Sequence, residues 1–343
     1  MTAADPGYDA GVDIDRVAPW LAEQLPQARA PFALAMAGVG RSNLTSVVAD
    51  AAGDRWVLRR PPLGELLQSA HDVAREHRIL SALEPTAVPT PAIHGLCEDR
   101  AVCDAPLMLM EFVDGVTLST RDAGAPLTDA TRHALGLHMI DALAEVHAVD
   151  LAATGLAELA THAPYAPRQL RRWTRQWEDT PTRDLPVVDE LAARLGAALP
   201  EQREVTLVHG DFHLANVIAG PQDGRVRAVV DWELSTLGDP VADLASFLAY
   251  WPENSDPGPP LMEAALLPGF ATRAELVDAY ADRTDRDLSD LGFWKVLALW
   301  KVAVIVEGVR HRGADEPGEH VPDVAVVDGL LSRAVAEADA AGL

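Results

Sequence analysis

Cysteine and lysine are scarce in this 343-residue chain. The two cysteines, Cys97 and Cys103, are too few for a disulfide framework, and no set of cysteines and histidines has the spacing of zinc ligands. Lysine occurs only at positions 295 and 301, so arginine carries nearly all of the positive charge. The sequence therefore excludes a disulfide-stapled fold and a structural zinc site, and it fits a reduced, cytoplasmic setting.

Long apolar runs without charges are also missing. The N-terminal stretch MTAADPGYDAGVDIDR is acidic and has no apolar core, so it does not predict a secretory signal. The longest apolar stretch, residues 293–309, is interrupted by Lys295, Lys301 and Glu307. This pattern is typical of a buried helix, and we expect no membrane partner.

Positive charge is low overall, because 28 Lys and Arg face 52 Asp and Glu, for a formal net charge of −24. Nucleic-acid binding needs a concentrated basic face, so we expect no nucleic-acid partner. The acidic excess has two interpretations: a cleft that attracts a cationic small molecule, or a diffuse surface that keeps the protein soluble. The chain is long enough for two lobes.

What the sequence does contain is a pair of stretches, LVHGDFHLANVIAG at residues 207–220 and VRAVVDWELSTLGDP at 226–240. Each begins with a run suited to a buried strand, which places Asp211, Asn216 and Asp231 at strand ends and loops. An Asp, an Asn five positions later and a second Asp after another strand resemble the order of a protein-kinase catalytic loop and metal-binding Asp. A turn and a strand end would explain either stretch alone, whereas both in this order favour phosphoryl transfer.

Phosphoryl transfer explains the three residue types. A carboxylate accepts the proton of the attacking hydroxyl, while an amide oxygen and a second carboxylate hold Mg²⁺ against the triphosphate. The sequence therefore proposes Asp211 as the base, with Asn216 and Asp231 as metal ligands.

The N-terminal third predicts a sheet of five strands and two helices. The expected helices cover residues 12–25 and 65–83, and the expected strands cover residues 32–36, 44–49, 56–59, 93–97 and 107–113. Between the first two strands, Gly38 and Gly40 allow close approach of a ligand, and Ser42 with the following amides is suited to bind phosphate oxygens. A simple hairpin would have the same sequence.

Arg59, near the end of the third strand, stands where a kinase carries the Lys of V-A-I-K. Glu76 lies in the middle of the following helix, so the two side chains are placed to form an ion pair that orients the cation toward the α- and β-phosphates. Alternation from Val57 favours Arg59 on this face. If Arg60 points inward instead, Arg59 becomes a surface residue.

The fifth strand, PLMLMEFVDG, leads toward the helical part of the chain. A kinase places its hinge at such a connection, where backbone groups of Glu111 and Val113 would bind adenine. An edge strand leaving a sheet would have the same sequence, so this prediction rests on chain order alone.

The rest of the chain predicts helices at residues 127–149, 241–251, 274–281, 293–310 and 323–338, with a Pro-rich loop at 252–268. Asp239 and Pro240 have the types of an N-cap and a first helical residue. We expect Asp243 to brace the catalytic loop and His147 to be a core histidine. The Arg- and Trp-rich stretch 164–186 fits an anionic acceptor pocket or a solvated helix face.

Taken together, HGDFHLAN, VVDWE with GDPVADLA, LAEVHAVD and MEFVDG resemble the aminoglycoside phosphotransferase/choline kinase family. More narrowly, GRSNLT, VLRRPP and AHDVAREHRIL are similar to a subgroup that includes kinase-like domains attached to some acyl-CoA dehydrogenases. In that subgroup Arg at position 59 belongs to the pattern. The resemblance covers residues 30–335.

The resemblance implies an α+β, two-lobed protein-kinase-like fold. Residues 1–113 would form a nucleotide-binding lobe with a five-stranded antiparallel sheet and a helix, and residues 114–343 a mainly helical catalytic lobe. ATP or GTP would bind between the lobes with Mg²⁺, and Ser42 and Asn43 would lie in the phosphate loop. The implied reaction is phosphorylation of a hydroxyl on a small molecule.

The sequence does not identify the molecule that accepts the phosphoryl group. The subgroup points to a hydroxyacyl-CoA or hydroxy acid, whereas the family name and the acidic charge point to an aminoglycoside. A nucleotide-binding pseudokinase scaffold is a third possibility, which the presence of the base and both metal ligands disfavours. The oligomeric state is not readable from the sequence.

Overall fold

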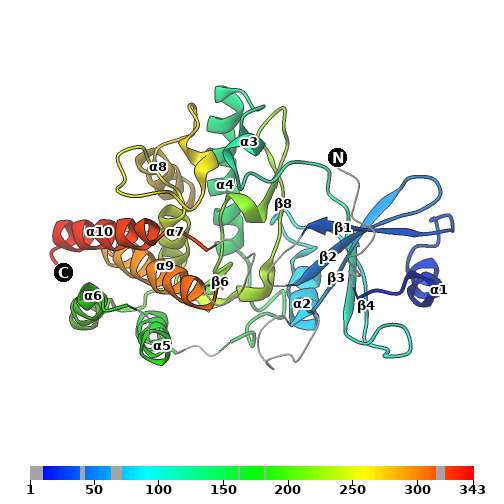
Figure 1. The fold of residues 1–343 in the computed structure, drawn as a ribbon, viewed down its shortest axis with the longest axis horizontal. Helices are drawn as coiled ribbons and strands as arrows, with labels where there is room; N and C mark the ends of the chain where they lie inside the picture. The colour runs from blue at the N-terminus through cyan, green and yellow to red at the C-terminus, as the bar shows by residue number, and fades with distance from the viewer. Residues whose placement is uncertain (1–10, 39–42, 63–71, 161–162, 181–182, 314–320) are drawn as a thin grey trace. The chain divides into compact units, whose positions relative to one another are not determined.

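The computed structural model describes residues 11–38, 43–62, 72–160, 163–180, 183–313 and 321–343. The chain forms two compact units (Figure 1). The first contains Met1–Asp114 together with Arg227–Glu233, and the second contains Gly115–Val226 and Leu234–Leu343. The short segment 227–233 thus belongs, with Asp231, to the first unit, although it follows Asp211 and Asn216 of the second unit in sequence.

The first unit contains a five-stranded sheet in the order β1-β2-β3-β5-β4, in which all neighbours are antiparallel. This confirms the predicted α+β class and the five strands. The strand bounds are β1 (Ala33–Gly38), β2 (Leu44–Ala49), β3 (Arg55–Arg60), β4 (Ile93–Cys97) and β5 (Leu107–Glu111). The last strand ends two residues earlier than predicted.

One face of this sheet packs on α1 (Ile14–Gln24), which begins at the N-cap Asp13. Residues of α1 and of the strands share one apolar core, formed by Val17, Leu21, Trp56, Leu58, Leu107 and Leu109 among others. The second helix, α2 (Val73–Leu83), contacts β4 and β5. The predicted start of this helix, at residues 65–71, lies outside the described residues.

The second unit is mainly helical, as predicted. Its helices are α3 (Arg121–Gly124), α4 (Asp129–His147), α5 (Tyr165–Asp179), α6 (Pro186–Ala197), α7 (Pro240–Ala249), α8 (Arg273–Thr284), α9 (Leu291–Gly313) and α10 (Val324–Ala341). Every residue of α7 is buried, and α9 packs against both α7 and α10. Asp239 caps α7 by accepting the N–H of Val241 at 2.9 Å, which confirms the predicted start.

Four short strands flank the segments that contain Asp211 and Asp231. β6 (Thr206–Val208) pairs antiparallel with β9 (Thr236–Gly238), while β7 (Val217–Ala219) and β8 (Val226–Val229) lie between them in sequence. Helices α3 and α6 and strands β7 and β9 were not expected from the sequence. Among the described residues, no helix has the length and apolar character needed to cross a membrane.

Candidate active site

The loop between β6 and β7 is shaped by its own residues. The ring of His209 is fully buried, and Phe212 and Leu214 point into the core with 0% and 1% exposure. Gly210 has φ +82°, and a Cβ there would lie 2.8 Å from the carbonyl oxygen of Leu234, so only glycine fits without a shift. The loop therefore holds Asp211 between two anchored positions.

Asp243 braces this loop from α7. Its carboxylate accepts the backbone N–H of His209 at 2.7 Å and that of Gly210 at 2.9 Å. His147 Nε2 lies 3.2 Å from the same carboxylate, and its Nδ1 lies 2.6 Å from the Tyr280 hydroxyl. The structure confirms that Asp243 is a brace and that His147 is a core residue.

Asp211 and Asn216 lie together, as their spacing predicted. The Asn216 side-chain N–H group donates to the Asp211 backbone oxygen at 2.8 Å and to its Oδ2 at 3.1 Å. His213, which the sequence reasoning did not select, places Nε2 3.4 Å from the same Oδ2. The only local signal for His213 was its position two residues after the predicted base.

The Asp211 carboxylate is kept charged. Burial raises its pKa, but the hydrogen bond and charge of His213, with the charges of His209 and Lys301, outweigh burial and bring the pKa below the usual 3.8. The side chain is still 28% exposed, compared with 2% for Asp243. Asp211 is therefore an ionised group that a small molecule can reach.

Arg59 is the centre of a charge cluster in the first unit. Its Nε lies 2.8 Å from Glu76 Oε2, and its Nη2 lies 2.5 Å from Asp231 Oδ1 and 4.0 Å from Glu233 Oε2. The predicted pairing of Arg59 with Glu76 is confirmed. Arg60 is buried as well, on the opposite face of β3, where it pairs with Asp104 at 3.0 Å.

Glu76 is 1% exposed, and burial raises its pKa to about 7, although Arg59 opposes this effect. It also accepts the backbone N–H of Trp232 at 3.2 Å, which fixes the segment next to Asp231. Asp231 itself has φ +68°, a backbone conformation that non-glycine residues rarely adopt. The turn thereby directs this carboxylate to Arg59.

The two predicted metal ligands have the chemistry that Mg²⁺ requires. Because the Asn216 nitrogen donates to Asp211, its amide oxygen is left to act as a ligand, and Asp231 retains the oxygen that Arg59 does not bind. No group of three or more His, Cys, Asp or Glu suited to a metal occurs in the described ranges. Mg²⁺ sites that use substrate phosphates need only one or two protein carboxylates, so this donor set fits.

Four further residues, Ser42, Asn43, Glu111 and Val113, were predicted to bind the nucleotide. Ser42 lies outside the described residues. Asn43 is buried, and its side-chain nitrogen donates to Glu233 Oε2 at 3.1 Å, which ties the start of β2 to the Asp231 segment. The Glu111 N–H donates to the Ala92 carbonyl at 2.8 Å, so this N–H is already used within the sheet. Val113 follows the end of β5.

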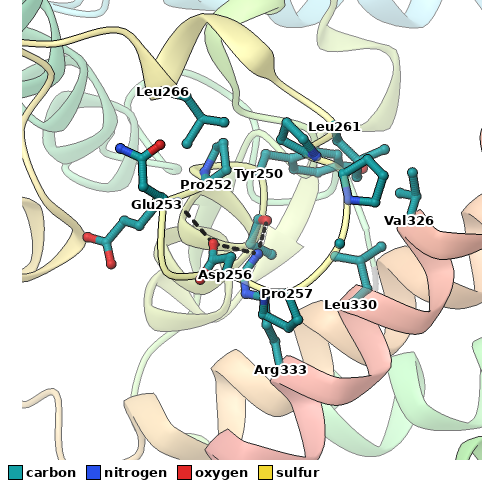
Figure 2. A pocket seen from close by; sticks show the side chains of 15 residues that line it. Tyr250, Pro252, Glu253, Asp256, Pro257, Leu261, Leu266, Val326, Leu330 and Arg333 are labelled. Atoms are coloured by element: carbon teal, nitrogen blue, oxygen red, sulfur yellow. Dashed lines mark hydrogen bonds and ion pairs between the residues drawn. The ribbon is translucent and has the colours of Figure 1, made fainter.

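A cavity of about 120 Å³ in the second unit was not foreseen from the sequence (Figure 2). It lies between the Pro-rich segment that follows α7 and the first half of α10, and Tyr250 and Arg333 line it. The Tyr250 ring lies 4.9 Å from the His213 ring, so the cavity adjoins the loop of Asp211.

The predicted anionic pocket in the Arg-rich stretch is less well supported. Arg171, Arg172 and Arg175 of α5 are exposed, and Arg168 donates to the Leu237 carbonyl at 2.7 Å. Most of this helix face therefore meets solvent.

Comparisons with known proteins agree with this geometry. A family model described as "Phosphotransferase enzyme family" matches residues 33–282. The chain is 37% identical over 313 residues to acyl-CoA dehydrogenase family member 10 of Mus musculus, which covers 90% of this chain. It spans only 29% of that longer relative.

Two solved structures share the fold. A proposed aminoglycoside phosphotransferase from Ralstonia eutropha has a TM-score of 0.75 and 28% identity, covering 96% of this chain and 97% of that one. An aminoglycoside phosphotransferase in a ternary complex with ADP and hygromycin B has a TM-score of 0.62 and 16% identity, with 93% and 97% covered.

Proposed function

The chain belongs to the phosphotransferase enzyme family, and on that premise we propose that it transfers the γ-phosphoryl group of ATP or GTP to a hydroxyl of a small molecule. The observation that carries this proposal is the ionised, reachable carboxylate of Asp211, which Asn216 contacts on a loop braced by Asp243. The ADP complex of a structure with the same fold supports a nucleotide as the donor.

Asp211 acts as the general base. The acceptor oxygen forms a bond to the γ-phosphorus while the bond from that phosphorus to the bridging oxygen breaks and the nucleoside diphosphate leaves. The hydroxyl proton passes to an Asp211 carboxylate oxygen. Its low pKa keeps that oxygen unprotonated at neutral pH, and a base of this kind contributes about 10²–10⁴-fold to the rate.

Asn216 and Asp231 are the residues that would hold Mg²⁺. When bound, the cation neutralises charge on the transferring phosphates. Arg59, fixed by Glu76, would orient the α- and β-phosphates, and its planar guanidinium can bind two phosphate oxygens where lysine offers a point charge. Ser42 and Asn43 would contribute to the phosphate loop. The Glu111 carbonyl and the Val113 backbone would bind adenine.

For the acceptor, the match to acyl-CoA dehydrogenase family proteins favours a hydroxyacyl-CoA or a hydroxy acid. An aminoglycoside is the second candidate, because structures named for that activity share the fold. A cavity of about 330 Å³ beside the start of α7 is acidic enough to suit a cation. Three of its six acids are paired with arginines, however: Arg286 binds Glu204 at 2.9 Å, and Arg203 binds Asp287 and Asp290.

The test of the proposed function is the Asp211→Ala variant, with the exposed Asp223→Ala as the matched control. We expect Asp211→Ala to bind nucleotide as the wild type does and to lose about 10²–10⁴-fold in turnover, because only proton transfer is removed. A panel of hydroxylated metabolites and aminoglycosides with ATP or GTP identifies the acceptor first. Undiminished phosphorylation by Asp211→Ala would refute the role of this base. A wild type that binds nucleotide but phosphorylates nothing would instead indicate a pseudokinase scaffold.

A further inference from the structure

Lys301 of α9 is a cation within electrostatic range of the catalytic loop, and it is one of the two lysines in the sequence. Its side chain is partly buried, and its Nζ lies 5.8 Å from the centroid of the Trp173 ring. Among the residues that the structure describes, the ammonium forms no hydrogen bond and no ion pair. A lysine placed in this way has all three of its N–H donors available.

The charges around Lys301 do not neutralise it. Burial has the largest effect and lowers the pKa of Lys301 below its usual 10.5, and the charges of Asp211 and Asp243 offset this only in part. Asp243 already accepts bonds from two backbone N–H groups and lies beside His147, and the exposed Arg172 adds a second positive charge. The ammonium therefore lacks a negative partner in direct contact.

A shallow hollow beside Lys301 lies between α5, α7 and α9 of the second unit, which Figure 1 labels. Its volume is about 10 Å³, so it admits one oxygen-sized group rather than a whole molecule. In the described part of the chain, no carboxylate lines it. Its polar lining consists of Tyr165, Gln169, Ser246 and Lys301.

The polar side chains of this hollow can all donate hydrogen bonds. Within the described ranges, the Tyr165 and Ser246 hydroxyls and the Gln169 side-chain N–H group have no hydrogen-bond partner, although the three residues are only 8%, 9% and 9% exposed. Gln169 uses its oxygen to accept the Trp173 Nε1–H at 3.1 Å, so its N–H group is what remains. Three neutral donors and a cation are suited to a negatively charged oxygen, because hydrogen bonds to charged groups are the stronger kind.

Helix α7 connects the hollow to the catalytic base. It lines the hollow and also carries Asp243, which braces the loop of Asp211. Burial raises the pKa of Asp211, and the charge of Lys301 is among those that lower it, with the larger effects of His213 and His209. A small molecule with one oxyanion in the hollow would therefore have its neighbouring carbons close to the base.

We propose that Lys301 and the hollow beside it bind a carboxylate of the acceptor, with the reacting hydroxyl a few carbons away at Asp211. The inference rests on the proposed phosphotransfer, and it narrows the acceptor to a hydroxy acid. Lys301 forms a charge-assisted bond to the carboxylate, to which Ser246 and Gln169 also donate. An aminoglycoside is disfavoured, because its ammonium groups would face the Lys301 charge and a lining of donors.

The binding test uses the scarcity of lysine. In the full chain labelled with ¹³C-lysine, only Lys295 and Lys301 give lysine signals in NMR spectra, and Lys301→Arg identifies them by removing one. Lys295 lies 3.6 Å from Glu337 and serves as the internal control. The probes are hydroxybutanoates with the hydroxyl on carbon 2, 3 or 4. We expect at least one of them to shift the Lys301 signal saturably and to leave the Lys295 signal unchanged.

Matched probes and variants isolate the carboxylate. Butane-1,3-diol and 4-aminobutan-2-ol replace the carboxylate of 3-hydroxybutanoate with a hydroxymethyl or an aminomethyl group, and they should shift neither signal. Ser246→Ala and Gln169→Leu keep the lysine signal, and each should weaken hydroxybutanoate binding about three- to tenfold, as expected for the loss of one hydrogen bond.

Four outcomes overturn the carboxylate site. In the first, no hydroxybutanoate shifts the Lys301 signal at the highest concentration tested. In the second, the diol shifts it as far as the hydroxybutanoate does. In the third, the Lys295 signal shifts equally, which indicates non-specific binding. In the fourth, the nucleotide analogue AMP-PNP with Mg²⁺ shifts the Lys301 signal as far in the absence of any acceptor, which assigns Lys301 to a nucleotide phosphate.

The kinetic arm compares two confirmed acceptors, one with a carboxylate and one without. We expect Lys301→Met to lose at least tenfold in kcat/KM for the first, chiefly through KM, and Lys301→Arg to recover most of that loss. For the second acceptor the change should stay within about threefold, whereas a merely structural role of Lys301 would affect both acceptors alike. An unchanged kcat/KM for the carboxylate acceptor overturns the link to the acceptor.

Failure of this inference and failure of the proposed function are distinguishable. If a hydroxybutanoate shifts the Lys301 signal but the wild type phosphorylates no acceptor, the proposed function fails while the carboxylate site stands. If the wild type phosphorylates an acceptor but no hydroxybutanoate shifts the Lys301 signal, the carboxylate site fails while the proposed function stands.

Discussion

Replacing Arg59 tests how much the stability of the first unit depends on the ion pair between Arg59 and Glu76. Glu76 is 1% exposed and is bound to Arg59 at 2.8 Å, so Arg59→Met leaves a buried carboxylate without its closest cation and beside the charges of Asp231 and Glu233. Breaking a buried pair from one side costs about 3–5 kcal/mol. The cost is smaller if Glu76 takes up a proton, because the neutral carboxylic acid needs no cation beside it.

The free energy needed to protonate Glu76 depends on pH. Keeping a glutamate protonated when its unfolded pKa is 4.5 costs about 1.4 kcal/mol per pH unit above that value. The limit is therefore about 2 kcal/mol at pH 6 and about 5 kcal/mol at pH 8. Burial already raises the Glu76 pKa to about 7 in the presence of Arg59, so its contribution to stability is complete below 4.5 and is lost as the pH rises through 7. We expect Arg59→Met to deepen this loss.

The assay is urea unfolding without nucleotide at pH 6 and pH 8, followed by tryptophan fluorescence. The buried Trp56 and Trp232 report on the first unit. The wild type already bears about 2 kcal/mol of this cost at pH 6 and about 3.5 kcal/mol at pH 8, because its Glu76 pKa is about 7. Relative to the wild type, Arg59→Met should therefore lose little through Glu76 at pH 6 and up to about 1.5 kcal/mol at pH 8. In Arg59→Met/Glu76→Gln most of the pH 8 loss should return, because Gln is neutral and keeps an oxygen for the Trp232 N–H. Equal losses at the two pH values, or a double variant as unstable as the sum of the single ones, would refute the reasoning.

Two further predictions concern the brace of the catalytic loop. Asp243→Ala leaves the N–H groups of His209 and Gly210 without their acceptor, and we expect a loss of about 3–5 kcal/mol in urea unfolding, against roughly half for Asp243→Asn. A wild-type unfolding midpoint for Asp243→Ala would contradict this. Burial lowers the His147 pKa below 6.5 although Asp243 opposes it, so the unfolded chain takes up a proton that the folded chain refuses, and stability falls as the pH drops below that value. His147→Gln should show a smaller loss of thermal stability between pH 7 and pH 5 than the wild type, and equal slopes would count against this assignment.

The parts of the site that could be predicted from the sequence are those that short-range geometry determines. Asp211 and Asn216 are five residues apart on one loop, so their contact follows from the loop length alone. Asp239 caps α7 through a local bond, and this cap places Asp243 in the first turn of the helix. Strand alternation placed Arg59 opposite the buried face of β3, and its partner Glu76 followed from the position of α2.

The parts that could not be predicted depend on segments far apart in the chain. Arg333 meets the cavity only because α10 packs on α9, which packs on α7, and no local pattern distinguishes this arginine from the others. The sequence does not show that His213 lies beside Asp211 and contacts the ring of Tyr250, which is distant in the chain. Helix α6 was missed because it has no side-chain cap and follows a stretch rich in Pro and Arg. The adenine-binding role of Glu111 and Val113 stays a prediction, and the sequence could not show that the Glu111 N–H already donates to the Ala92 carbonyl.

The different environments of the Asp211 and Asp243 carboxylates help to distinguish an enzyme from a nucleotide-binding scaffold. Asp243 is 2% exposed and uses its oxygens on two backbone N–H groups and on His147, so it has no capacity to accept a proton from a substrate. Asp211 is 28% exposed, and its contacts come from Asn216 and His213 side chains that leave part of the carboxylate open. Both groups keep low pKa values against the effect of burial, and each does so through its own set of donors. A scaffold that only binds nucleotide would gain nothing from holding a second, reachable carboxylate ionised at a cost in desolvation. The arrangement therefore supports the proposed proton transfer at Asp211 over the alternative of a nucleotide-binding scaffold.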